Sequence, residues 1–235
     1  MSFFASVIPR VLRVQIIYFF LKLLNPYLFS TYAKLNSSQK SYWTASMVST
    51  LVSMYLCFQI TREMLVVDIN DFSVSSPGLR NALYTFTAYL ASDLILNVRY
   101  RNSWPGAGLC ILHHSIAGLM MSLFLTVPIW PHGQIAQGLL AEFTNPFVNQ
   151  IYFFKTAGMK TSPLVRANSL LLVSAWFVFR IVNFSVLARR FCLVYPQLIL
   201  ASPCIAKINS SFFGILYYMQ WAWFHKILRG FLKQF

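Results

Sequence analysis

Acidic side chains are the scarcest group in this chain of 235 residues. Asp and Glu number five against nineteen Lys and Arg, and charged residues of all kinds make up only 10% of the sequence. A soluble domain carries about 25% charged residues, because its surface faces water. The chain lacks the charge to cover such a surface, which excludes a soluble enzyme.

Apolar residues take the place of the missing charge, at 57% of the sequence with a mean hydropathy of +0.60. This composition excludes intrinsic disorder and requires most of the exterior to face lipid. The net charge of +14 does not indicate a nucleic-acid partner, because it reflects missing acids and because the basic residues lie mostly between apolar runs. Cations in that position are typical of the loops beside membrane helices.

Seven apolar runs lie between polar segments or segments containing Pro and Gly. They cover residues 11–30, 41–60, 81–98, 109–127, 133–154, 164–187 and 204–224. Each is close to the ~20 residues that a helix needs to cross a hydrocarbon core. Helices are the expected spanning form, because backbone polar groups find no water in lipid. The sequence therefore predicts an all-α polytopic membrane bundle with six or seven transmembrane helices around a central cavity.

The first run leaves two alternatives open. It is interrupted by three basic residues and a proline, namely Arg10, Arg13, Lys22 and Pro26. Residues 11–30 therefore either span the membrane or lie flat in its interface as a cationic amphipathic helix. We accordingly predict that residues 1–38 form an N-terminal membrane or interfacial helix and that residues 39–235 form the main domain.

The distribution of basic residues predicts the orientation of the chain. The side that holds the carboxyl terminus carries ten Lys and Arg against six if the first run spans, and twelve against four if it does not. Because loops rich in Lys and Arg stay in the cytosol, both versions place the carboxyl terminus there. The glycosylation acceptor Asn36-Ser37-Ser38 shares this side, so we expect it to stay unmodified.

Two acids, Asp93 and Glu142, lie inside apolar runs. The other three lie between the second and third runs: Glu63, Asp68 and Asp71. A charged group at membrane depth is costly and almost always faces the protein interior or a cavity. Arg180 is the only cation deep within a strongly apolar run. We therefore expect both buried acids to face the interior, with at least one of them close to Arg180.

Further polar residues recur at helical spacing around each acid. Around Asp93 they are Thr85, Tyr89 and Asn97, and around Glu142 they are Asn145, Asn149 and Tyr152. Each set lies on one helical face. Pro146 interrupts the backbone hydrogen bonds of the second set, and a broken helix at membrane depth needs cover from protein or a cavity. Two interpretations stay open, hydrogen bonding between helices and the polar wall of a functional cavity.

His113 and His114 are adjacent near one end of the fourth run. Neighbouring helical positions point about 100° apart, so the two rings are not placed to share one metal ion. Neutral histidine acts as a base or nucleophile in some proteins and hydrogen-bonds between helices in others. These residues are therefore catalytic candidates only if the protein is an enzyme, and the sequence predicts neither a metal ion nor another cofactor.

Five segments, taken in order, resemble the TLC domain. They are SYWTASMVSTLVS, YLASDLILNVRY, LHHSIAGL, GLLAEFTNPFVNQIYFF and QWAWFHKILRGFLK. Ceramide synthases, translocating-chain-associated membrane proteins and smaller lipid-linked relatives share this membrane domain. The resemblance covers about residues 40–230, is closest to the small transmembrane TLC-domain-containing proteins, and identifies residues 39–235 as the TLC domain.

The resemblance implies a cavity for lipid. Ceramide synthases wrap helices around a cavity open to the cytosol, where an acyl chain and a sphingoid base meet. Their double histidine corresponds to His113 and His114, whereas their later histidine–aspartate pair has no clear equivalent here, where Glu142, Asn145 and Asn149 stand. These departures favour a protein that binds or handles lipids in membrane lipid homeostasis or trafficking without catalysing a reaction.

The alternative function is an N-acyltransferase that uses acyl-CoA and a sphingoid base. His113 or His114 would then act as base or acyl-accepting nucleophile, oriented by Asp93 or Glu142. A third possible function is that of a cargo-escort protein of the early secretory pathway. Such a protein needs a cytosolic coat signal, and Lys233 stands near the carboxyl end without a paired lysine, which makes this function the weakest of the three.

The expected partners are membrane lipids, whether sphingolipids, phospholipids or fatty acyl chains, and no nucleic acid. The expected location is the endoplasmic reticulum or another endomembrane, with the plasma membrane as the alternative. The predicted polar wall of the cavity is Asp93, Asn97, Glu142, Asn145, Asn149, Tyr152 and Arg180.

Overall fold

A computed structural model describes residues 3–66, 76–126 and 132–233. Within these ranges the chain is helical and contains no strand. The elements are α1 (Phe3–Leu28), α2 (Ser30–Ala33), α3 (Ser37–Met64), α4 (Pro77–Arg99), α5 (Ala107–Thr126), α6 (His132–Gly138), the 3₁₀ helix η1 (Leu139–Thr144), α7 (Asn145–Thr156), α8 (Pro163–Trp176), the π-helix η2 (Phe177–Val182), α9 (Asn183–Ala201) and α10 (Pro203–Leu232). The predicted all-α bundle is confirmed.

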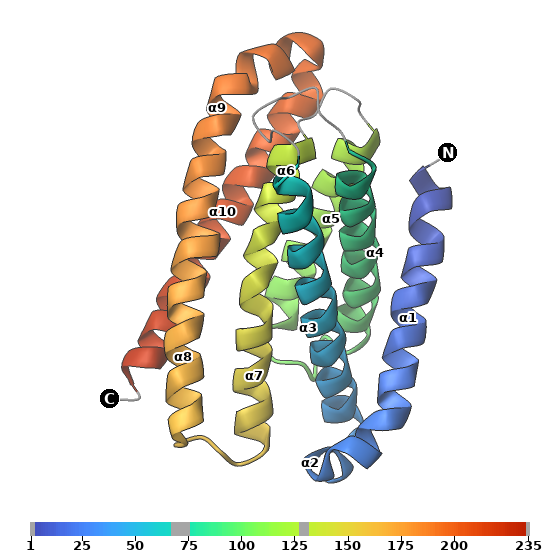
Figure 1. The fold of residues 1–235 in the computed structure, drawn as a ribbon, viewed down its shortest axis with the longest axis vertical. Helices are drawn as coiled ribbons and strands as arrows, with labels where there is room; N and C mark the ends of the chain where they lie inside the picture. The colour runs from blue at the N-terminus through green and yellow to red at the C-terminus, as the bar shows by residue number, and fades with distance from the viewer. Residues whose placement is uncertain (1–2, 67–75, 127–131, 234–235) are drawn as a thin grey trace.

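Membrane-spanning length and apolarity are met by four stretches of this bundle. They are α1, α3, α5 and the continuous helix Pro163–Ala201 that α8, η2 and α9 form together. The long helices run side by side along the long axis in alternating directions, and the two termini lie toward opposite ends (Figure 1). α2, the α7–α8 connection and the carboxyl terminus lie at the same end. The chain is therefore built as an integral membrane helix bundle.

Helix starts follow from local capping chemistry. Asn36 accepts a hydrogen bond from the Gln39 amide at 2.9 Å, and the Gln39 side chain accepts one from the Asn36 amide at 3.1 Å. This reciprocal pair satisfies two amides that the first turn of α3 leaves free. Ser76 and Ser162 cap α4 and α8 by accepting one backbone amide each, and each is followed by a proline at the first helical position.

α1 packs lengthwise against α3 and α4 (Figure 1). Arg10 donates to the Asn81 side chain at 2.8 Å, and Gln15 donates to the Ser92 hydroxyl on the same helix, α4. Large apolar side chains such as Phe20 point away from these contacts and are exposed. An apolar outer face and polar bonds inward are the pattern of a helix that spans the membrane beside its neighbours, which favours the first alternative for residues 11–30.

Two predicted segments end differently in the structure. Glu63 belongs to the last turn of α3 and is buried, so it is not part of a loop, while Asp68 and Asp71 lie outside the described residues. The run predicted at 164–187 continues as helix to Ala201. The pair Arg189 and Arg190 ends the apolar run, but arginine is a good helix former and therefore does not end the helix.

Candidate functional site

A cavity of about 480 Å³ lies among α3, α4, α5, η1, α7, α8, η2 and α10. Its lining extends to Trp104, Pro105 and Gly106 in the α4–α5 connection and to Gly230 and Phe231 near the carboxyl end of α10. The cavity therefore reaches the end of the bundle that holds the carboxyl terminus. Eight of the nine sequence-predicted site residues line it: Asp93, Asn97, His113, His114, Glu142, Asn145, Asn149 and Arg180.

Tyr152 is the exception, because it does not line the cavity. Its hydroxyl lies 3.4 Å from the Gln39 carbonyl, and its ring packs edge-on against Tyr42 with the centroids 4.6 Å apart. Thr85 also points elsewhere, since its hydroxyl donates to the Asn81 carbonyl within α4 at 2.8 Å. The two sets of polar residues predicted around Asp93 and Glu142 therefore extend beyond the cavity wall.

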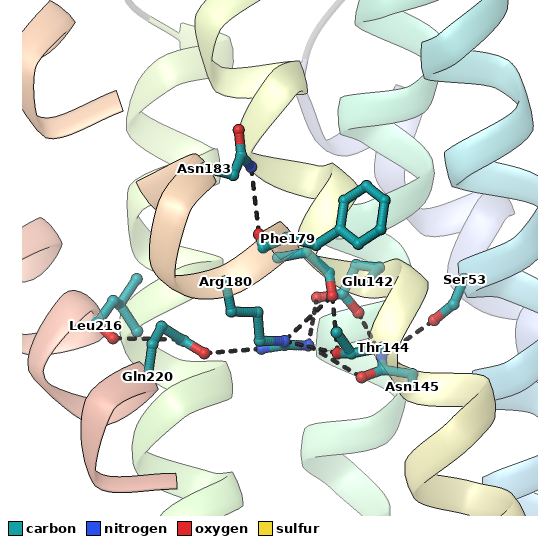
Figure 2. Close-up of polar contacts among 10 residues, drawn as sticks. Ser53, Glu142, Thr144, Asn145, Phe179, Arg180, Asn183, Leu216 and Gln220 are labelled. Atoms are coloured by element: carbon teal, nitrogen blue, oxygen red, sulfur yellow. Dashed lines mark hydrogen bonds and ion pairs between the residues drawn. The ribbon is translucent and has the colours of Figure 1, made fainter. Parts of the chain in front are cut away.

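Glu142 and Arg180 meet at the inner end of the cavity. Arg180 Nη2 lies 3.6 Å from Glu142 Oε1, and both side chains are almost fully buried. Asn145 joins them, donating to Glu142 Oε2 at 2.6 Å and to the Ser53 hydroxyl at 3.1 Å. Figure 2 shows the three side chains converging from two helical segments, with Ser53 on a third. The structure thus places one buried acid beside Arg180, as expected from the sequence.

Every nitrogen of the Arg180 side chain has a partner within the protein. Nε donates to Thr144 Oγ1 at 2.7 Å and to the Ala141 carbonyl at 3.1 Å. Nη1 donates to Gln220 Oε1 at 3.0 Å, and Nη2 donates to Asn145 Oδ1 at 3.0 Å (Figure 2). A guanidinium with every edge engaged by protein ties η1, α7 and α10 to one point. We call Arg180 and these hydrogen-bond partners the Arg180 clasp, a structural element at membrane depth.

Irregular helix geometry supplies the partners of this clasp. Pro146 lies in the first turn of α7, and the preceding residues Leu139–Thr144 tighten into a 3₁₀ helix. Such a segment leaves carbonyls without their usual α-helical donors, and the one at Ala141 accepts from Arg180 instead. Arg180 itself lies in the π-helix η2, a geometry that often occurs at functional sites.

Asp93 has a different partner, His114. Asp93 Oδ2 lies 3.2 Å from His114 Nδ1 and accepts a hydrogen bond from the Asn97 side chain at 2.8 Å. The second buried acid is therefore paired with a histidine and an amide rather than with Arg180. A carboxylate beside Nδ1 orients an imidazole and favours the tautomer that carries its proton on that nitrogen. Within the described chain, however, His114 Nδ1 makes no hydrogen bond, so its contact with Asp93 is one of proximity and charge.

His113 faces the same cavity with less support. Its Nδ1 is buried and has no hydrogen-bond partner within the part of the chain that the structure describes. The ring centroid lies 5.5 Å from that of His114 and 5.2 Å from that of Trp223. A buried polar atom without a partner is costly, so it marks a place where a bound molecule can supply one.

A second, smaller chamber of about 110 Å³ adjoins the first. His113, Glu142 and Arg180 line both spaces, so these side chains form the layer between them. Beyond this layer the wall is almost entirely apolar, with Ala117, Met120, Met121, Phe124, Leu187, Phe191 and Phe213 among its residues. The site therefore combines a polar-lined cavity with an apolar chamber.

Inter-helix bonding accounts for Asn149. Its amide donates to the Ser46 carbonyl at 2.9 Å and to the Thr50 hydroxyl at 3.0 Å, which joins α7 to α3. Thr144 and Gln220, which the sequence analysis did not identify, serve the Arg180 clasp in the same manner. Gln220 is one of two amides inside the apolar run 204–224, together with Asn209. The argument that identified Asn145 from its place in an apolar run would have identified Gln220 as well.

Comparison with known proteins gives the family. The TLC domain profile matches residues 12–229. The chain belongs to the TLC domain family. The TLC domain-containing protein 4-B of Xenopus laevis is 29% identical over 214 residues, which cover 85% of this chain and 78% of that protein. No solved structure matches the chain. The match begins within α1, and the division of this TLC protein at residue 38 stays a prediction.

Proposed function

We propose that this protein binds a membrane lipid in the cavity and thereby serves lipid homeostasis or trafficking without catalysing a reaction. The observation that carries the proposal is the pair of adjoining spaces, one polar and one apolar, with a shared wall at His113, Glu142 and Arg180. An amphiphile matches both, because its chain suits the apolar chamber and its head suits the polar cavity. Asp93, Asn97 and Asn145 complete the polar wall.

Filling the chamber tests the binding of lipid. Ala117 is buried on α5 and lines the chamber, whereas Leu119 lies on the same helix and is exposed. Ala117→Phe should displace the chain and reduce the lipid that co-purifies with the protein several-fold, while Leu119→Phe should retain it. Native mass spectrometry of both variants in detergent measures the retained lipid. Equal retention by both variants, with the Ala117→Phe protein folded, would contradict the proposal.

The second candidate function is N-acyl transfer from acyl-CoA to a sphingoid base. It is favoured by the imidazole of His114, which lies 3.2 Å from Asp93, next to His113 with its unpartnered Nδ1. An oriented histidine beside an acid is the arrangement of a general base. The Glu142–Arg180 pair gives this reading less support, since its hydrogen bonds are taken up by protein.

Histidine variants separate the two functions. If the histidines only form a wall, His113→Asn with His114→Asn should preserve lipid binding, because an amide still hydrogen-bonds. If they catalyse, product formation from long-chain acyl-CoA and sphingosine should fall by about 10²–10⁴-fold. We expect binding without turnover in the wild type. Turnover that is lost in the folded variant would replace the first function with the second.

For localisation, we propose an endomembrane such as that of the endoplasmic reticulum, with the carboxyl terminus in the cytosol. The cytosolic position of the carboxyl terminus is supported by the excess of basic residues at that end of the bundle.

A further inference from the structure

Two exposed lysines, Lys155 and Lys226, line the outer part of the polar cavity. Lys155 lies in the last turn of α7, eleven positions into that helix, and Lys226 lies in the second half of α10. At about 1.5 Å of rise per residue, Lys226 stands ~9 Å beyond Gln220, and Lys155 stands ~15 Å beyond Asn145. Both lysines therefore lie between the Arg180 clasp and the end of the bundle that holds the carboxyl terminus.

No acid neutralises these lysines among the described residues of the lining. The two acids of the cavity are Asp93, which is paired with His114 at 3.2 Å, and Glu142, which is paired with Arg180 at 3.6 Å. Neither lysine takes part in an ion pair within the described parts of the chain. Two unneutralised ammonium groups in a concave, partly apolar site attract an anion and repel a cation.

The chamber beyond the clasp has room for one hydrocarbon chain. Each water-sized group needs about 10–15 Å³ of such a space, so 110 Å³ accommodates roughly ten methylene-sized groups. On α9 the chamber wall runs from Phe184 to Phe191, and on α10 from Gln220 back to Phe213, a depth of ~10 Å on either helix. This depth is about a third of a ~30 Å hydrocarbon core, so the chamber holds part of one acyl chain, and the rest of that chain lies in the adjoining cavity. A lipid with two chains does not fit.

His113 lies between the lysines and the apolar chamber. Its ring borders both spaces, and its buried Nδ1 lacks a partner in the described chain. A ligand with a hydroxyl or ester at the junction of head and chain would supply that partner. From the outside inward the site thus offers two cations, a hydrogen-bonding group and an apolar chamber for one chain.

We propose that the cavity selects single-chain lipids with a phosphate headgroup, held by Lys155 and Lys226, with the chain in the apolar chamber. This inference rests on the proposed lipid binding and specifies the class of lipid. The order of polar and apolar groups in the site is that of a lysophospholipid. A sphingoid base, which is a single-chain cation, is disfavoured by the same two lysines.

Tryptophan fluorescence measures this selectivity directly. Trp104, Trp176 and Trp223 line the cavity, so a brominated acyl chain that enters it quenches their emission. All proteins carry Trp221→Phe, because Trp221 is exposed on α10 and a probe in the detergent would quench it without entering the cavity. The probes share one dibromostearoyl chain and differ in headgroup: lysophosphatidate, lysophosphatidylcholine, monoacylglycerol and the coenzyme A thioester. The test variant is Lys155→Gln with Lys226→Gln. The control is Lys160→Gln with Lys233→Gln, which removes two exposed cations from the same end of the bundle but outside the cavity lining.

We expect the wild type to bind lysophosphatidate more tightly than the neutral monoacylglycerol. The test variant should lose about 5- to 30-fold of its affinity for lysophosphatidate, as expected for the loss of one or two charge-assisted contacts. Its affinity for monoacylglycerol should be unchanged, and the control should match the wild type. A preference for lysophosphatidate over the thioester supports the inference, whereas a preference for the thioester would point to acyl-CoA, the substrate of the second candidate function, and would overturn it.

Two other results would also overturn the inference. One is equal binding of the anionic and neutral probes by the wild type. The other is an equal loss of lysophosphatidate binding in the test and control variants, which would attribute the effect to surface charge. Failure of the proposed function gives a different signature, namely no quenching by any probe.

Discussion

Arg180 contributes to the fold through the neutralisation of Glu142 and through the carbonyl and amide groups it satisfies in η1, α7 and α10. Taking two charges out of water is expensive, so such a pair need not stabilise the protein relative to apolar residues. Removing one member is different, because the other remains as a buried, uncompensated charge. The stability of the bundle should therefore depend on keeping both members or losing both.

We expect Arg180→Met to lower the stability of the protein by about 3–5 kcal/mol. The double variant Arg180→Met with Glu142→Gln should recover part of this loss, because no buried carboxylate is left alone. The matched control is Arg189→Met, at an exposed arginine on α9. Thermal unfolding in detergent measures all three variants. Similar melting temperatures for Arg180→Met and Arg189→Met would show that the contacts of Arg180 do not stabilise the fold.

At the scale of elements, the junction of α3 and α4 depends on a glycine. A Cβ at Gly78 would overlap the Glu63 carboxylate, which accepts from the Ser76 hydroxyl at 2.6 Å beside the first turn of α4. A carboxylate near a helix amino terminus is favoured by the free amides of the first turn. Gly78 therefore makes room for the acid that joins the end of α3 to the start of α4.

Gly78→Ala should push the Glu63 carboxylate away from α4 and cost about 1 kcal/mol. Gly214→Ala is the control, because that glycine also lies inside a helix and a Cβ there meets no atom within 4 Å. Alanine is the better helix former, so the control should be neutral or stabilising by up to about 1 kcal/mol. Thermal unfolding of the two variants under one set of conditions compares them. A Gly78→Ala protein as stable as the control would show that Glu63 relaxes without loss.

The elements that the sequence predicts well are those whose signal is local. Apolar length and proline position predicted the helices. The spacing of polar residues around Asp93 and Glu142 predicted most of the side chains that share the cavity wall, with Thr85 and Tyr152 as exceptions. The π-helix at Phe177–Val182 was not predictable, because Arg180 is the only unusual residue in FVFRIV and a buried cation does not by itself indicate π-helical hydrogen bonding. Its geometry accompanies contacts of Arg180 with residues 36 to 40 positions away.

Partner choice among buried groups was predictable only in part. The expectation that an acid approaches Arg180 required charge alone, but which acid does so depends on how α4 and η1 sit around α5. Asp93 lies on the same side as His114, a pairing that no spacing rule indicates. The two chambers likewise arise from the packing of distant helices. No single segment of the sequence indicates that the two cavities exist, whereas the helically spaced polar residues can be found within one segment.

At the scale of the whole molecule, the basic residues and the outer part of the cavity lie at the same end of the bundle. The end of the bundle with α2, the α7–α8 connection and the carboxyl terminus holds Lys34, Lys160 and Lys233, and the cavity lining reaches toward this end at Gly230 and Phe231 (Figure 1). Loops rich in Lys and Arg stay on the cytosolic side of a membrane. The polar cavity should therefore be reached from the cytosol and from the leaflet facing it.

Glycosylation reports this orientation without disturbing the bundle. Asn36 precedes α3 at the end of the bundle that holds the carboxyl terminus, so the native acceptor Asn36-Ser37-Ser38 should remain unmodified in cells. The substitution Asp71→Asn places an asparagine two positions before Ser73 and so creates a new acceptor in the sequence between α3 and α4. This engineered site should gain a glycan, because it follows a helix that crosses to the opposite side. A shift in gel mobility that is removed by glycosidase measures both, with Asn36→Gln as the control for the native site. Modification at Asn36, with none at position 71, would invert the protein and place the mouth of the cavity in the lumen.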